Sequence, residues 1–157
     1  MINEIISHLH PIVVHFPIVI ITLLALYDLL FAIIKRTASR NGHWLWLLAF
    51  LSAWLAIGTG PEHDARGNTN NFHYHDTLAT ITTWFSFLVA AFRFFFVIKK
   101  KEMIKQWLAI GTILSLICAV GILSVGYFGG KMVYDQGIGV KIDGKYVNPP
   151  KSYSEHR

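Results

Sequence analysis

Apolar residues run through this chain in four long blocks, and polar residues gather in the segments between them. The blocks cover about residues 11–34, 44–58, 78–98 and 107–128. A helix rises about 1.5 Å per residue, so about 20 apolar residues cross a bilayer. The first, third and fourth blocks meet that length, and the second is short. The pattern predicts a membrane protein with several spans.

This alternation predicts an all-α fold, a four-helix transmembrane bundle with up-down-up-down order. We expect residues 1–134 to form the membrane domain and residues 135–157 to form a short extramembrane tail. The glycines at 137, 139 and 144 indicate turns in that tail and predict a short hairpin. Hydrophobic residues make up 54% of the 157 residues and charged residues only 15%, which is typical of a polytopic membrane protein rather than a soluble domain.

The charged residues between the blocks predict the orientation. The two connectors that follow the first and third blocks are strongly basic and contain a single acid, Glu102. Their basic residues are Lys35, Arg36, Arg40, Lys99, Lys100, Lys101 and Lys105. Positive connectors stay in the cytoplasm, so we expect both termini and the 59–77 loop outside, although the basic C-terminal tail argues mildly against this. The net charge of +5 then reflects topology, and we expect no nucleic acid partner.

The predicted topology places most of the histidines at one membrane face. On the outer side lie His8, His10, His15, His63, His73 and His75. His43 lies on the cytoplasmic side. His15 sits about one turn inside the apolar block, where an unpaired imidazole is costly. Snorkelling to the interface is the alternative for His15 alone, but two clusters at the same depth favour a ligand site.

Imidazole nitrogens bind haem iron, copper and zinc alike. Two rings on facing helices suit the iron of haem b, and we expect His15 and His75 to point inward as the axial pair. His10 and His73 are the next candidates and would hold a second haem. The alternative is a copper or iron site built from the same four histidines, His10, His15, His73 and His75.

Other residues would support such a site. His63 or Asp64 could complete a metal shell or fix the tautomer of a ligand histidine. Gly129 and Gly130 would give the porphyrin edge room, although glycine is also common in transmembrane helix packing. The single cysteine, Cys118, excludes a disulfide framework and a thiolate cluster.

Asp28 and Arg93 form a second polar feature. Asp28 lies six residues before the end of the first block, and Arg93 lies five before the end of the third. Charges at that depth usually pair, so we expect an intramembrane ion pair with a structural role.

The sequence also resembles a known family. The motif HPIVVHFP at 10–17, with GGKMVY at 129–134 and GIGV at 137–140, is similar to the bacterial membrane family catalogued as domain of unknown function 2231. The likeness runs over nearly the whole chain. It implies the bacterial inner membrane, with the termini and the histidine cluster on the periplasmic side. Relatives fused to or encoded near c-type cytochrome modules imply a redox role by analogy.

Together these features predict a b-type cytochrome-like electron-transfer protein or subunit. We expect lipids as surroundings and a c-type cytochrome or a respiratory complex as partner, and a homo-oligomer is compatible with the sequence. The alternatives are a copper- or iron-binding membrane protein, or an accessory subunit whose histidines line a partner interface. The chain has neither a nucleophile–base pair nor a glycine-rich phosphate loop, so we expect no catalytic activity of its own.

Overall fold

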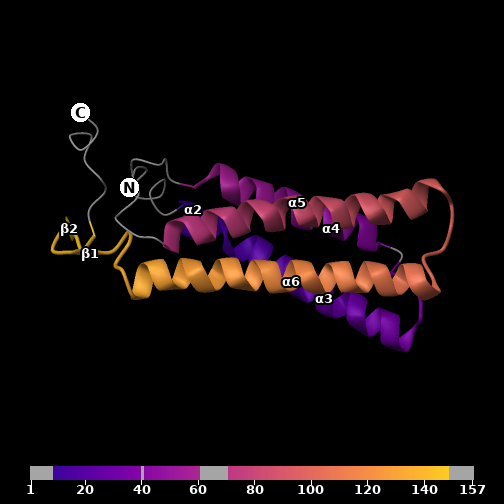
Figure 1. Ribbon diagram of the computed structural model, residues 1–157. Coiled ribbons are helices and arrows are strands. Elements are labelled where there is room, and N and C mark those ends of the chain that lie inside the picture. The colour runs from indigo at the N-terminus through magenta and orange to yellow at the C-terminus, as the bar shows by residue number, and fades with distance from the viewer. Residues whose placement is uncertain (1–8, 40, 61–70, 149–157) are drawn as a thin grey trace.

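The structure, a computed structural model, describes residues 9–39, 41–60 and 71–148, and most of this part is helical (Figure 1). Its helices are α2 (Leu9–Val13), α3 (His15–Ile34), α4 (Gly42–Gly58), α5 (Asn71–Ile98) and α6 (Lys105–Tyr134), and its strands are β1 (Lys141–Ile142) and β2 (Lys145–Tyr146).

The helices α2 and α3 form one rod with a local irregularity at Val14. The Val14 N–H donates to His10 O at 3.0 Å, so the hydrogen-bond ladder continues across the junction. Pro17 has no N–H to give to the carbonyl four residues before it. The proline therefore accounts for the interruption within an otherwise continuous first span.

Each helix of the bundle runs antiparallel to the next one along the chain. The α2 end of the first rod meets the end of α4, where His10 bonds Ala56. The start of α4 in turn meets the end of α5, where Gly42 lies against Arg93. α5 and α6 run in opposite directions, and α6 also packs on α3 (Figure 1). The predicted all-α bundle with up-down-up-down order is confirmed.

The distribution of side chains is that of a membrane bundle. The interior contains hydroxyl residues, and both Ser86 and Ser115 are completely buried. The outer surface is apolar, with Leu23, Trp54 and Trp84 each about 60% exposed. An apolar surface of this extent needs lipid around it.

Within the described residues, three rods are long and apolar enough to cross a membrane: Leu9–Ile34, Asn71–Ile98 and Lys105–Tyr134. α4 has 17 residues and is about 25 Å long, which is less than the hydrocarbon thickness of about 30 Å. It packs against α3 and α5. The chain is thus a multi-pass membrane protein in which α4 is shorter than each of the three long rods.

A short hairpin follows α6, where the glycines of the tail predicted one. β1 and β2 pair antiparallel through Lys141 with Tyr146 and Ile142 with Lys145. The turn between them is Asp143–Gly144, and both residues have positive φ, 49° and 76°. This is the backbone that an Asp-Gly type I′ turn requires. The hairpin lies at the end of the bundle where α2 begins (Figure 1).

Candidate functional site

His10 is held between the first rod and the end of α4. Its ring is half-buried, and Nδ1 lies 3.1 Å from Ala56 O and 3.3 Å from Thr59 Oγ1. The carbonyl can only accept, and the Thr59 hydroxyl donates to the same carbonyl at 2.9 Å. Nδ1 therefore carries the proton, and in the neutral ring Nε2 carries the lone pair.

His75 is held in the same manner between α5 and α6. Its half-buried ring places Nδ1 3.0 Å from Val125 O. A Cβ at Gly129 would lie only 3.3 Å from His75 Cε1, so the glycine lets the ring approach the backbone of α6. The carbonyl can only accept, so it again assigns the proton to Nδ1.

The two rings lie at the same end of the bundle, His10 where α2 meets the end of α4 and His75 near the start of α5. They come from different spans, and each is oriented by a main-chain carbonyl of a neighbouring helix. Histidines that bind metals typically donate Nδ1–H to such a carbonyl, because this fixes the tautomer and the ring orientation. The structure thus places two carbonyl-oriented imidazole rings, from different spans, at one end of the bundle.

The expectation that His15 points inward is wrong. Its side chain is exposed, and Nδ1 lies 2.5 Å from Pro11 O of the same rod. The inward face of α3 includes Pro17, Ile21 and Leu24. At about 100° per residue, His15 lies two positions before Pro17 and faces nearly the opposite way, whereas His10 lies seven positions before it and shares its face.

The structure also describes His73 and Gly130 of the predicted site. His73 is exposed, with its ring beside Tyr74, and a Cβ at Gly130 would meet nothing within 4 Å in the described part of the chain. His63 and Asp64 lie outside the described residues. Within residues 9–39, 41–60 and 71–148, no group of three or more His, Cys, Asp or Glu side chains could hold a metal ion.

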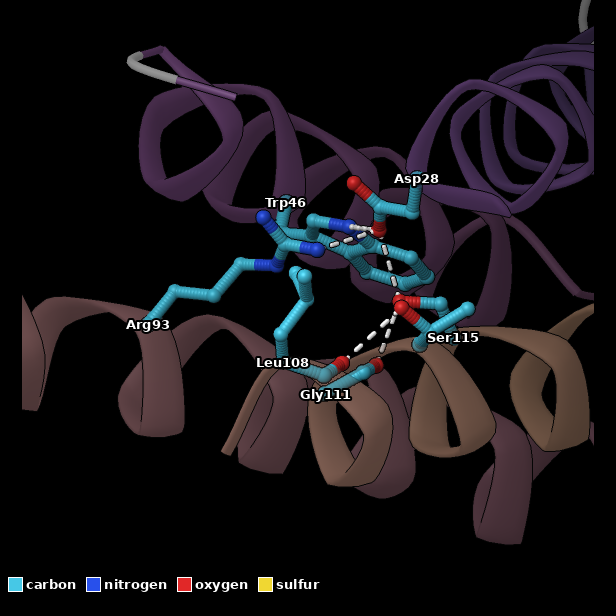
Figure 2. A network of polar contacts seen from close by, with 7 residues as sticks. Asp28, Trp46, Arg93, Leu108, Gly111 and Ser115 are labelled. Carbon is cyan, nitrogen blue, oxygen red and sulfur yellow. Dashed lines mark hydrogen bonds and ion pairs between the residues drawn. The ribbon is translucent and has the colours of Figure 1, made fainter. Parts of the chain in front are cut away.

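A second polar centre lies in the other half of the bundle (Figure 2). Arg93 Nη2 forms an ion pair with Asp28 Oδ2, and both side chains are almost fully buried. The same oxygen accepts from Trp46 Nε1 at 2.8 Å and from Ser115 Oγ at 2.7 Å. The sequence pattern predicts equal depth for Asp28 and Arg93, and the structure pairs them.

Sequence reasoning missed the two other donors to Asp28. Ser115 had a visible signal, since a serine in an apolar block is a polar group that needs a partner. Trp46 had none, because tryptophan near the start of a span usually marks the membrane interface.

A comparison with protein families gives one match, which covers residues 7–142 and is described as "Predicted membrane protein (DUF2231)". Searches of curated proteins and of solved structures found no significant match.

Proposed function

The chain belongs to the DUF2231 family of predicted membrane proteins, and from this premise we propose that it is a b-type cytochrome-like electron-transfer protein or subunit that binds haem b. The axial ligands in this proposal are His10 and His75, with His10 in the role that we expected for His15. The observation that carries it is the pair of half-buried imidazoles whose Nδ1 atoms are bonded to main-chain carbonyls. Bound haem supplies an iron that carries one electron.

The number of histidines favours haem over a bare metal ion. A porphyrin supplies four nitrogens, so the protein needs only two axial ligands. A copper or iron ion without a porphyrin draws all its ligands from the protein, and the described residues offer no group of three or more candidate ligands. Within the described part of the chain, two oriented histidines are thus sufficient for haem and fewer than a bare ion needs.

The surroundings of each ring agree with a planar ligand. Gly129 lies against His75, and a Cβ at Gly60 would be 3.9 Å from His10 Cε1. Glycine at both places lets the imidazole rings lie close to the neighbouring backbone. The residues of the chain would hold the iron and keep both imidazoles in one tautomer, while the apolar helices would limit the access of water.

The location of this centre is part of the proposal. The basic connectors lie at the opposite end of the bundle from His10 and His75, and positive connectors favour the cytoplasm. We place the haem at the periplasmic face of a bacterial inner membrane, where a c-type cytochrome or a respiratory complex could exchange electrons with it.

The test is the visible spectrum of the full chain, expressed with added haem and purified in detergent. We expect a Soret band and a reduced-minus-oxidised difference. His10→Ala and His75→Ala should each remove the spectrum or convert it to a high-spin form. His15→Ala is the matched control on the same rod, and His43→Ala is the control at the other end. Both should leave the spectrum intact.

Folded wild-type protein that stays colourless in the presence of haem would overturn the proposal. Metal analysis of that colourless protein would then decide between a copper or iron site and an accessory subunit without a metal. Loss of the spectrum in His15→Ala, with His10→Ala unchanged, would return the axial role to His15.

A further inference from the structure

A pocket of about 420 Å³ lies at the end of the bundle that carries the basic connectors. It is enclosed by the connector that precedes α4, the first turn of α4, the last turns of α5 and the connector that follows α5. Its polar lining is Thr37, Ser39, His43, Arg93, Lys101 and Glu102. Its apolar lining is Ala38, Phe96, Val97 and Met103. The volume is in the range of pockets that bind small molecules.

Two buried donors in this lining have no acceptor among the described residues. Ser39 is 7% exposed and Arg93 is 5% exposed, and neither Ser39 Oγ nor Arg93 Nε has a hydrogen-bond partner there. Arg93 reaches Asp28 through Nη2, so the Nε edge of the guanidinium is left for another group. Arg93 Nε can only donate, and its missing partner is therefore an acceptor.

The donors converge at the start of α4. A Cβ on Gly42 would collide with both Arg93 Nη1 and Ser39 Oγ, so these two groups approach each other over the first residue of the helix. The N-terminal end of a helix favours negative charge because its first amides point outward. Lys101 adds a cation to the lining, and Glu102 is its one acid. The combination favours an oxyanion over a neutral ligand.

The position of the pocket favours a lipid as the source of that oxyanion. α5 ends at Ile98, and the pocket lies at that end, where the span meets the basic connectors. Anionic lipids attract such connectors, and basic pockets between spans bind their headgroups. Free phosphate would satisfy the donors but has no apolar part to contact the pocket lining formed by Phe96, Val97 and Met103.

We propose that this pocket binds the phosphate of an anionic phospholipid, with Ser39 and Arg93 as donors and Lys101 as a further cation. The apolar lining faces the glycerol and acyl portion of the lipid. This site is separate from His10 and His75, and it does not depend on haem binding.

The test uses full-length protein, purified in detergent and stripped of lipid, and measures bound lipid by native mass spectrometry. Dioleoyl phosphatidylglycerol is the probe, and dioleoyl phosphatidylcholine and inorganic phosphate are the comparisons. Ser39→Ala and Lys101→Gln should each weaken phosphatidylglycerol binding about tenfold, the effect of one lost interaction with a charged group. Ser124→Ala and Lys131→Gln, matched changes toward the other end of α6, should not change it.

Lys101 is exposed, so Lys101→Gln is expected to fold even if Ser39→Ala does not. Phosphatidylglycerol binding that is the same in all four variants would overturn the site. Equal binding of phosphatidylcholine would contradict the selection of an anionic headgroup by the pocket. Binding of inorganic phosphate with the same affinity and the same dependence on Ser39 and Lys101 would overturn the lipid and assign the pocket to a free phosphate.

Discussion

One carboxylate oxygen, Asp28 Oδ2 on α3, accepts from a side chain on each of the other three helices. The donors are Arg93 on α5, Trp46 on α4 and Ser115 on α6. The single Ser115 proton is also within reach of Gly111 O, at 2.9 Å, so it can serve only one of the two acceptors at a time. At the scale of a single residue, one oxygen of Asp28 therefore links all four helices.

We expect Asp28→Asn and Arg93→Gln each to lower stability strongly. Each change leaves the other charge buried and unpaired, which costs about 3–5 kcal/mol. The double variant should lose less than the sum of the two, because no unpaired charge remains. Trp46→Phe removes one donor to a charged group, so we expect a smaller loss of stability, about 1.5–3 kcal/mol. Thermal unfolding in detergent measures all four, and strict additivity of the two charge changes would contradict the pair.

A second prediction at this scale uses two neighbouring glycines of α6. Gly129→Ala would place a methyl group 3.3 Å from His75 Cε1 and 3.5 Å from Nδ1, so the ring must shift and its bond to Val125 O must lengthen. We expect weaker haem binding. Gly130→Ala meets nothing within 4 Å in the described structure and should be neutral or gain up to about 1 kcal/mol of helix stability.

Haem titration of the purified apoproteins separates these two glycine variants. Equal haem affinity in both would show that the approach of His75 to α6 does not matter for binding. A loss in Gly130→Ala alone would place the cofactor on the other side of the helix.

At the scale of helices, several interior hydroxyl groups bond within their own helix rather than to a neighbouring one. Ser86 Oγ donates to Thr83 O at 2.7 Å, and Thr112 Oγ1 donates to Leu108 O at 2.9 Å. These hydroxyls donate to carbonyls of their own helices, so these hydrogen bonds do not join neighbouring helices. Association of the helices must then rely on close packing of small residues, as is usual in membranes.

Gly121→Ala tests this packing between α5 and α6. The added Cβ would lie 2.6 Å from Thr82 Oγ1, so the packing of α5 on α6 must adjust. Overpacking of this kind lowers stability by about 1–3 kcal/mol. Gly126→Ala is the control on the same helix, because its Cβ would make an ordinary contact of 3.5 Å with Ile18. Thermal unfolding should show a loss for Gly121→Ala only, and adding Thr82→Ala should restore part of it. Equal stability of both single variants would refute tight packing here.

At the scale of the whole molecule, the charges and the oriented histidines lie at opposite ends. The connectors between α3 and α4 and between α5 and α6 are basic. His10 and His75 lie at the other end of the bundle, together with the β hairpin (Figure 1). Antiparallel order brings both connectors to one end, and positive charge near span ends resists translocation.

We therefore expect both termini to face the periplasm. An alkaline phosphatase reporter, which is active only outside the cytoplasm, should be active when it is fused after Arg157 and silent when it is fused within the 35–41 connector. The reverse result would show the opposite orientation in the membrane, with the histidine pair on the cytoplasmic side. It would also move the pocket with Ser39 and Arg93 to the periplasmic leaflet.

The order and approximate bounds of the spans followed from the hydropathy pattern alone. The predicted blocks at 11–34 and 78–98 end where α3 and α5 end, at Ile34 and Ile98. The reason is that backbone groups in hydrocarbon must be satisfied within the span, so an apolar block of sufficient length has to be helical. The depth of Asp28 and Arg93 followed in the same way from their distance to the ends of the blocks.

Which side of each helix faces inward became visible only in the packed bundle. In a soluble helix the apolar stripe marks the buried face, but in a bilayer both the lipid and the core are apolar, and the sequence pattern is nearly the same on both sides. This is why His15 was expected inside and His10 occupies that place. It is also why Trp46 and Ser115 could not be assigned to Asp28, since rotation about the helix axis is fixed by packing rather than by hydropathy.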